Sequence, residues 1–288
     1  MFSFPDILEF SIASYVDTAV DWILSTFKGF FNIINEVLFF SFDVTEAVLS
    51  FIPWFVMILA LVVGIWKLYS LKTGLVLGVI LFLIGVFGMW DKMIYTLVIV
   101  IISVIISILI GIPSGIIMSK SKKVEKIMKP LLDAMQTMPS FVYLIPAIMI
   151  FGLGKVPAIF ATTIYAVPPL IRLTYLGIVG VDKEVKEAGI AFGSTPMQLL
   201  FKIEFPQAMP SIMTGLNQTT MMAMSMVVIS SMIGAGGIGE NVLTAIRRLE
   251  IGKGFEAGLV VVFLAIILDR LLQGFANKNI KTGDNNAE

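Results

Sequence analysis

Long apolar segments are the feature of this sequence that most constrains its fold. Hydrophobic residues make up 58% of the 288 residues, and charged residues make up only 14%. A soluble globular protein exposes too much surface to water for that balance. The segments are about 20 residues long, which suits a membrane-spanning helix and is about twice the length of a membrane β-strand. The sequence therefore predicts an all-α integral membrane protein.

Seven of these segments are predicted to span the membrane. They are residues 49–67, 73–90, 94–118, 138–153, 156–178, 211–235 and 257–275. Before them, residues 5–34 place most of their charged side chains on one helical face. This pattern predicts an amphipathic helix that lies at the outer membrane surface, and the alternative is a further, poorly formed span.

The distribution of charge predicts the orientation of the chain. Residues 1–66 carry seven acidic residues and one lysine. Five lysines follow the third predicted span, namely Lys120, Lys122, Lys123, Lys126 and Lys129. Because lysine and arginine are enriched on the cytoplasmic side, we expect the N-terminus outside and the C-terminus in the cytoplasm, which agrees with an odd number of spans. The lysine cluster could also bind membrane lipid with anionic headgroups.

Several classes of function are disfavoured by residues that the sequence lacks. It contains no cysteine and no histidine, which removes thiol chemistry, the usual zinc sites and histidine catalysis. No nucleotide-binding G-x-x-x-x-G-K-[ST] motif is present. The formal net charge is zero, so nothing suggests a nucleic-acid partner. We therefore expect a chain that is not an enzyme and holds no metal or cofactor.

A charged segment, residues 183–210, lies between the fifth and sixth predicted spans. Its pattern predicts two short amphipathic helices joined by a turn, and Gly193 can end the first of them. A capping box is expected to begin the second helix, with Thr195 as N-cap, Pro196 at the first position and Gln198 at the third. Two prolines are expected to end it, Pro206 and Pro210. The alternative is a surface loop that merely connects two spans.

This segment resembles the EAA loop of ABC-importer permeases, whose pattern is E-A-A, three residues, G, nine residues, I-x-L-P. The matching residues are Glu187, Ala188, Gly189, Gly193, Ile203, Phe205 and Pro206. Two residues differ from the pattern: Gly189 replaces the second alanine, and Phe205 replaces leucine. Glycine is expected to destabilise the first helix by up to about 1 kcal/mol relative to alanine. The resemblance implies that the segment is a coupling helix that seats in a groove of a cytoplasmic ATPase subunit.

Three further segments are similar to permeases for glycine betaine, proline betaine and related osmolytes. They are Asp133–Gly154, Tyr165–Ile178 and Gly215–Gly239. The resemblance implies the permease of a type I ABC importer in a prokaryotic plasma membrane, working as a homodimer with a separate ATPase and a separate extracytoplasmic substrate-binding protein. The implied substrates are quaternary ammonium osmoprotectants of the glycine betaine, proline betaine, carnitine or choline class.

Two alternatives remain open at this point. The coupling loop does not separate an osmolyte permease from one for another small solute such as an amino acid. A self-contained channel or secondary carrier is less favoured, because the predicted spans hold almost no ionisable residue and such carriers usually need them.

On this reading the chain has four parts. They are an extracytoplasmic amphipathic segment (1–48), two accessory transmembrane helices (49–92), the permease core (93–276) and a cytoplasmic polar tail (277–288).

The most polar run inside a predicted span is a candidate for the substrate pathway. It comprises Asn217, Gln218, Thr219 and Thr220. These side chains could line the pathway, and the alternative is that they form hydrogen bonds between helices. Tyr143 could offer a cation–π contact to a trimethylammonium group.

The predicted outer segment, residues 236–256, is a candidate surface for docking the binding protein. Arg247, Arg248 and Glu250 are the residues proposed for that role, and the alternative is a solvated loop. The glycine-rich run at residues 234–239 is expected to be a flexible outer end of the sixth span.

Overall fold

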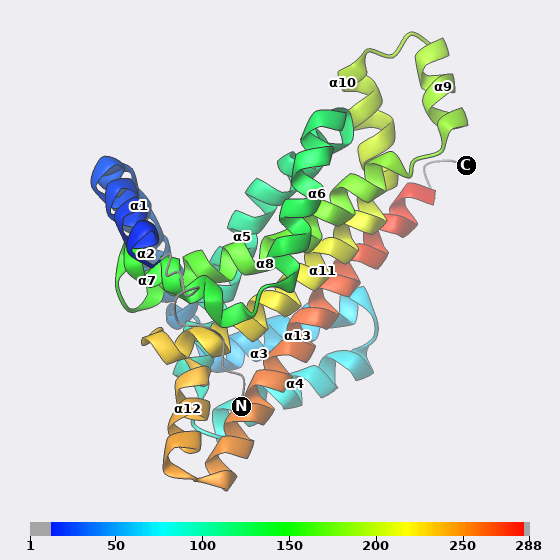
Figure 1. Ribbon diagram of the computed structural model, residues 1–288. Helices are drawn as coiled ribbons and strands as arrows, with labels where there is room; N and C mark the ends of the chain where they lie inside the picture. The colour runs from blue at the N-terminus through cyan, green and yellow to red at the C-terminus, as the bar shows by residue number, and fades with distance from the viewer. Residues whose placement is uncertain (1–12, 285–288) are drawn as a thin grey trace, which may run out of the picture.

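The computed structural model describes the backbone of residues 13–284 and the side chains of residues 14–275. Every regular element in this part of the chain is helical (Figure 1). The α-helices are α1 (Ala13–Thr26), α2 (Lys28–Phe51), α3 (Trp54–Leu68), α4 (Leu71–Val86), α5 (Trp90–Lys120), α6 (Lys122–Thr137), α7 (Leu144–Phe151), α8 (Lys155–Val179), α9 (Lys183–Ala191), α10 (Pro196–Leu199), α11 (Phe205–Ser230), α12 (Ile238–Arg248) and α13 (Ile251–Asp284). The all-α prediction is confirmed.

Four helical stretches are long and apolar enough to cross a membrane. They are α5, α8, the continuous stretch Pro196–Ile233 and the segment Ile251–Phe275 of α13. Two further pairs meet the same test only together: α2 with α3, bent by 91°, and α6 with Ser140–Phe151, bent by 111°. α4 is a shorter apolar helix. The prediction of a full span at residues 138–153 is wrong, because the helical turns from Ser140 to Phe151 rise only about 18 Å.

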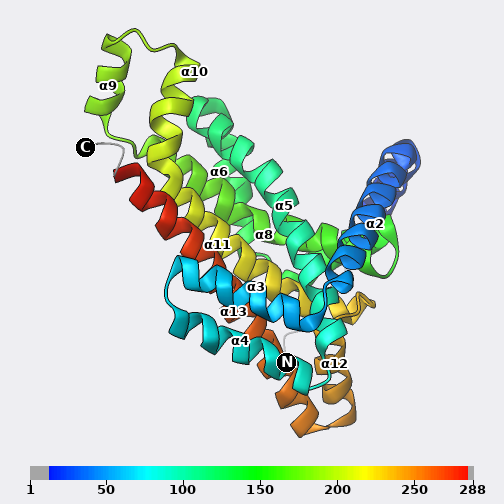
Figure 2. The same cartoon turned by 180° about the vertical axis from the view of Figure 1, so that it is seen from behind.

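The centre of the molecule is formed by α5, α8 and α11, with α13 packed against α11. Small residues let α5 and α8 approach closely, as is common between membrane helices. A side-chain carbon at Gly115 would lie 2.6 Å from Cβ of Thr174. α3 and α4 pack on each other and on α13 beside this centre (Figure 2).

The N-terminal helices form an arm that projects from the body (Figures 1 and 2). The amphipathic helix predicted for residues 5–34 begins outside the described residues and does not end at residue 34, because α2 continues to Phe51. It stops there because Pro53 disfavours helical geometry at Ile52, whose ψ is 119°. The arm is held to the body by Lys155 of α8, which pairs with Asp43 and lies 4.0 Å from the ring centroid of Phe39.

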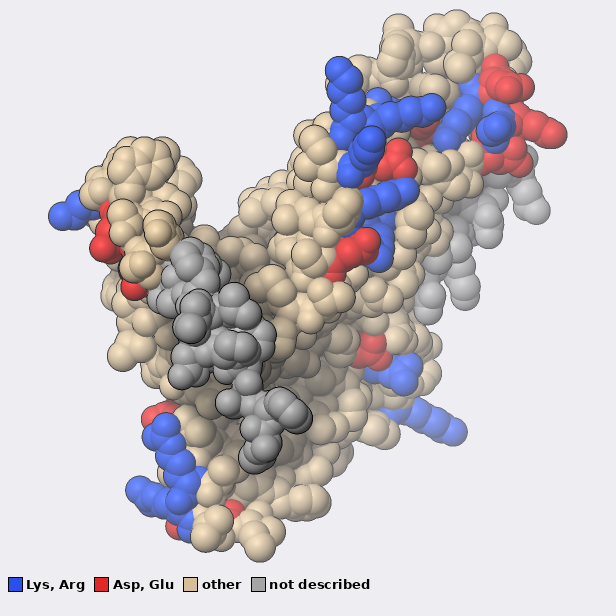
Figure 3. Space-filling view, in the orientation of Figure 1, with Lys and Arg blue, Asp and Glu red and all other residues tan. Residues whose placement is uncertain are grey.

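Charged side chains gather mainly at two ends of the face shown in Figure 3. One end carries α6 and α9, and the other carries α12 (Figures 1 and 3). Smaller charged groups lie on the projecting arm and at the right-hand edge of this view, and the central surface is largely uncharged. This distribution is what a membrane-embedded body with two water-facing ends requires.

Candidate functional site

The first helix of the predicted coupling segment, α9, is capped at both ends. The carboxylate of Asp182 accepts a hydrogen bond of 2.9 Å from the backbone N–H of Glu184. At the other end Gly193 has a φ of 79°, its N–H bonds to the carbonyl of Ile190 (2.9 Å), and the N–H of Ser194 bonds to the carbonyl of Gly189 (3.1 Å). This is a Schellman motif, which requires a left-handed residue. The prediction that Gly193 ends the helix is confirmed.

The predicted capping box at the start of α10 is also present. The hydroxyl of Thr195 accepts a hydrogen bond from the backbone N–H of Gln198 (3.3 Å). The side-chain oxygen of Gln198 accepts one from the backbone N–H of Thr195 (2.9 Å). Pro196 occupies the first turn, where its missing N–H has no intrahelical partner to lose.

Pro206 and Pro210 do not end this helix, contrary to prediction. The helical stretch runs without interruption from Pro196 to Ile233. A π-helical turn, Leu200–Glu204, precedes Pro206, and the N–H of Phe205 bonds to the carbonyl of Leu200. Such a widened turn accommodates the register change that a proline imposes, so the chain need not break. The second helix of the hairpin is therefore continuous with the membrane helix α11.

The residues of the EAA-like pattern divide into an exposed set and a buried set. Glu187 and Ala188 are exposed on α9, whereas Gly189 is buried against the π-helical turn. A methyl group at Gly189 would lie 2.5 Å from Cδ1 of Ile203, the flexible end of that side chain, so the side chain would have to move to admit alanine here. Phe205 packs beside a buried cluster that contains Leu170 and Ile212. The pattern thus both presents a surface and fixes the hairpin geometry.

The hairpin consists of α9, α10, the turn between them and the π-helical turn Leu200–Glu204, and it presents an apolar tip. Its exposed fractions are 92% for Phe192, 65% for Met197, 59% for Ile190 and 55% for Phe201. The tip lies at one end of the molecule, at the top of Figure 1. Exposed large apolar side chains grouped in this way are characteristic of a surface that another protein covers.

A buried carboxylate beneath the hairpin was missed by the sequence reasoning. The Glu204 side chain is only 5% exposed and pairs with Lys120 at the end of α5. It also lies 3.8 Å from the ammonium of Lys186 on α9. The available signal was its position at the variable residue of Ile203-x-Phe205-Pro206, where an acid stands in an otherwise apolar stretch.

The four polar residues proposed for the pathway do not share one surface. Four successive helical residues point in different directions, since each turns by about 100°. Asn217 donates a hydrogen bond of 2.9 Å to Asp269 on α13, while Thr219 and Thr220 are buried within the chain. Only Gln218 is exposed. This geometry favours the interhelical alternative for Asn217.

Tyr143 is buried rather than open to a passing solute. Its hydroxyl donates a hydrogen bond to the backbone carbonyl of Met135. Its ring lies 5.6 Å from that of Tyr165 in an edge-to-face arrangement. Neither contact shows a pathway role, and the cation–π contact remains a prediction.

The segment predicted to face outward is largely helical, whereas its alternative was a loop. α12 covers Ile238–Arg248, with Arg247 and Arg248 exposed at its end, and Glu250 pairs with Lys253 at 3.0 Å. Leu249 follows with a φ of 57° and an exposed fraction of 85%. This is the only positive φ outside glycine in the described part of the chain.

The glycine-rich run before α12 forms a hydrogen-bonded turn, and its expected flexibility stays a prediction. Gly234, Gly236 and Gly237 have positive φ values, which glycine adopts readily. The N–H of Ile238 donates a hydrogen bond of 2.9 Å to the hydroxyl of Thr96 on α5. The turn thereby fixes α12 to the membrane core.

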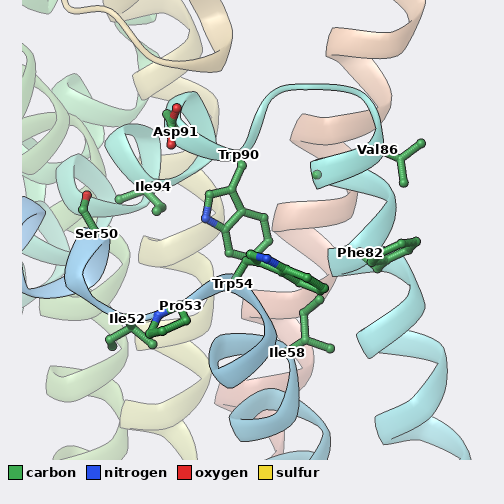
Figure 4. Close-up of a pocket in the computed structure, with 11 residues that line it drawn as sticks. Ser50, Ile52, Pro53, Trp54, Ile58, Phe82, Val86, Trp90, Asp91 and Ile94 are labelled. Atoms are coloured by element: carbon green, nitrogen blue, oxygen red, sulfur yellow. The ribbon is translucent and has the colours of Figure 1, made fainter.

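A cavity of about 540 Å³ lies away from the hairpin, between the α2–α3 bend, α4 and the start of α5 (Figure 4). Its lining is aromatic and aliphatic apart from Ser50 and Asp91. The Trp54 and Phe82 rings lie 6.2 Å apart. Within the described residues, no group of three or more histidine, cysteine or acidic side chains could hold a metal ion.

Comparison with known proteins identifies similar chains. Residues 103–281 match the family model described as "Binding-protein-dependent transport system inner membrane component". The chain is 45% identical to the glycine betaine/carnitine transport permease protein GbuB of Listeria monocytogenes over 282 residues, covering 96% of this chain and 99% of the relative. It is 43% identical to the glycine betaine transport system permease protein OpuAB of Bacillus subtilis over 274 residues, with 95% and 97% coverage.

Two further similarities extend these findings. The chain is 42% identical to the glycine betaine/proline betaine transport system permease protein ProW of Escherichia coli over 271 residues, covering 94% of this chain and 77% of the relative. A solved chain of the MetNI methionine ABC transporter, in an inward facing conformation, has a TM-score of 0.55 and 23% identity, covering 65% of this chain and 92% of that chain. The structural similarity supports the type I permease fold.

Proposed function

The chain belongs to the family of binding-protein-dependent transport system inner membrane components, and from this premise we propose that it is the permease subunit of an ATP-driven importer for compatible solutes. The similar permeases from three bacteria are named for glycine betaine, with carnitine or proline betaine in two of them. These are quaternary ammonium zwitterions. This chain is 42–45% identical to those permeases over nearly its whole length, which supports the same substrate class here.

The hairpin is the observation that carries the proposal. Its apolar tip stands at one end of the molecule, and its second helix is continuous with α11. A separate ATPase subunit that covers the tip would therefore move a membrane helix directly. Closure of the ATPase dimer on ATP would pull two hairpins, one on each copy of the chain, and rock the membrane helices between inward- and outward-open states.

The same arrangement and the lysine distribution support one orientation of the chain. The hairpin would lie in the cytoplasm, and α12, at the opposite end, would face outward (Figure 1). A separate binding protein would dock there on Arg247, Arg248 and Glu250. The N-terminus would be extracytoplasmic, in the plasma membrane of a prokaryote.

The solute would pass between two copies of the chain. An exposed polar stripe runs along α11, with Thr214, Gln218 and Ser225 at spacings of four and seven residues. These spacings place the three side chains on one helical face. The hydroxyls of Thr214 and Ser225 bond to backbone carbonyls one turn earlier, so Gln218 is the side chain of this face least suited to lipid, and a polar pathway that a second copy completes would suit it. Among the residues suggested for the pathway, Gln218 is the one that this face supports.

Reconstitution tests the proposed function. The permease, an ATPase subunit and a binding protein would be combined in proteoliposomes, and uptake of labelled glycine betaine would be compared with uptake of an amino acid. We expect ATP-dependent uptake of the betaine. Betaine uptake by the purified permease without ATPase would contradict the proposal and favour a self-contained carrier, and preference for the amino acid would contradict the substrate class.

A charge reversal tests the coupling role of the hairpin. Glu187→Lys should abolish ATP-driven uptake while the chain still inserts in the membrane. Glu184→Lys is the matched control, since it makes the same change at another exposed position of α9. Wild-type uptake by Glu187→Lys would contradict this assignment.

A further inference from the structure

The buried Glu204 side chain connects the hairpin to helices other than the one that carries it. We infer that Glu204 is a positioning residue that ties the hairpin to the inner ends of α5 and α8, so that hairpin movement reaches three membrane helices instead of α11 alone. This inference rests on the proposed function and concerns how force leaves the hairpin.

The first step is the burial of the carboxylate. The Glu204 side chain is 5% exposed, and a charge so buried must be paired to be tolerated. Its partner Lys120 is the last residue of α5, and the Lys120 side chain is still 44% exposed. Lys120 has solvent available and so does not need this carboxylate, whereas Glu204 depends on the lysine. The pair therefore holds the π-helical turn against the end of α5.

The second step is the link through Lys186 on α9. Its ammonium lies 3.8 Å from the Glu204 carboxylate and donates a hydrogen bond of 2.9 Å to the carbonyl of Ile178. Ile178 lies in the last turn of α8, where unpaired carbonyls and the helix dipole favour a cation. One carboxylate thus joins α9 and, through Lys186, the end of α8.

The third step is the π-helical turn that presents Glu204. The turn contains the wide hydrogen bond from the N–H of Phe205 to the carbonyl of Leu200. It places Glu204 inside and leaves Lys202 exposed. π-Helical turns occur frequently at functional sites, because they aim a side chain that a regular helix would direct elsewhere.

Packing alone does not explain the choice of an acid here. Gly189 and Ile203 already hold α9 against the turn by close contact. Replacing a buried ion pair by apolar side chains is often neutral or stabilising. What the carboxylate adds is a hydrogen-bonded ion pair with Lys120 on α5 and an electrostatic attraction to Lys186 on α9, which an apolar side chain cannot provide.

A distance measurement tests the connection without any partner protein. The chain has no cysteine, so spin labels can be placed through Ala191→Cys on α9 and Lys123→Cys on α6, both at exposed positions. In nanodiscs we expect one narrow distance distribution for the otherwise unchanged chain. Glu204→Gln should at least double its width, Glu204→Asp should broaden it less, and the matched control Glu184→Gln should leave it unchanged. An unchanged distribution for Glu204→Gln would overturn the inference.

Transport measurements test the consequence in the full assembly. Glu204→Gln should keep the ATPase subunit bound within twofold but lower uptake per ATP hydrolysed at least tenfold, and Glu204→Asp should recover part of it. If Glu204→Gln shows the same uptake per ATP as the wild-type chain, the inference is overturned. Loss of ATPase binding in this variant would also overturn it, because it would place Glu204 in the docking surface. If Glu204→Gln does not insert, Lys120→Gln should show the same uncoupling to at least the same extent, because it leaves the buried carboxylate with Lys186 alone, and full coupling in that variant would equally overturn it.

The two proposals fail in different ways. If the wild-type assembly shows no ATP-driven uptake, the proposed function is wrong whatever the distances show. If the wild-type assembly transports and Glu204→Gln is fully coupled, only the positioning role of Glu204 is wrong.

Discussion

Gly189 faces Ile203 across the hairpin so closely that a methyl group on Gly189 would lie 2.5 Å from the Cδ1 atom of Ile203. Cδ1 of Leu199 would be 3.0 Å away. The alanine of the E-A-A pattern would therefore fit here only if the ends of the Ile203 and Leu199 side chains moved, whereas glycine leaves both in place. This contact is present only in the folded hairpin.

A double-mutant cycle tests this contact. Gly189→Ala alone should change the stability of the hairpin by no more than about 1 kcal/mol, because the overpacking is partly relieved by movement of the Ile203 side chain and alanine favours the helix. Ile203→Val removes the crowded Cδ1 atom and by itself should cost about 1 kcal/mol. We expect the double variant to be more stable than the sum of the single changes predicts, as measured by hydrogen exchange of the α9 amides. Additive changes would contradict the contact.

Gly193 tests whether hairpin geometry controls uptake. Its left-handed conformation should make Gly193→Ala cost about 1–2 kcal/mol, although a methyl group there would meet no neighbour within 4 Å. Gly193→Trp should abolish ATP-driven uptake while the chain stays inserted. Gly193→Asn is the control, because asparagine tolerates this conformation, and it should retain most uptake. Wild-type uptake by the tryptophan variant would refute the prediction.

Asn217 and Gln218 are neighbours that the structure assigns to different surfaces. Asn217→Leu should remove the hydrogen bond to Asp269 and lower the free energy of unfolding by about 0.6–1.7 kcal/mol. Gln218→Leu should leave stability nearly unchanged but alter the rate or selectivity of betaine uptake, since this side chain is exposed on α11. Unfolding in detergent and uptake in proteoliposomes would be measured for both. A loss of stability in Gln218→Leu together with altered uptake in Asn217→Leu would contradict the assignment of the two side chains.

The arginines at the end of α12 test docking of the binding protein. Reversal of Arg247 and Arg248 to glutamate should raise the binding-protein concentration needed for half-maximal uptake, with a smaller effect when that protein is saturating. The charge reversal should matter less at high salt, because exposed charges are screened. Unchanged uptake at limiting binding protein would remove the docking assignment.

Leu249 offers an independent test of the same surface. It occupies the left-handed position after α12, where the N–H of Glu250 bonds to the carbonyl of Ala245 (2.9 Å). Leu249→Gly should relieve about 1–2 kcal/mol of backbone strain. We expect the variant to unfold at a higher temperature. We also expect it to bind the substrate-binding protein more weakly, because an exposed leucine held in a strained conformation suggests a functional contact. Tighter docking by the glycine variant would oppose this expectation.

Local sequence signals were sufficient for several elements. The apolar segments indicated the membrane fold, and the ends of the hairpin helices followed from Gly193 and from the pair Thr195 and Gln198. Each of these features depends on residues that are close together in the sequence. Their physical cause is short-range: hydrophobic length, capping hydrogen bonds and the conformational freedom of glycine.

Other features depended on contacts between distant residues, and here the sequence reasoning failed. Prolines were expected to end the second hairpin helix, but packing sustains a π-helical turn that lets the helix continue into α11. The pairing of Glu204 with Lys120 spans 84 residues, and no local pattern indicates it. The sequence by itself determined a membrane-embedded helical chain with a folded hairpin between two of its spans. Only the tertiary structure decided which side chains the hairpin buries and which helices it touches, because burial of a charge selects its partner by proximity in space.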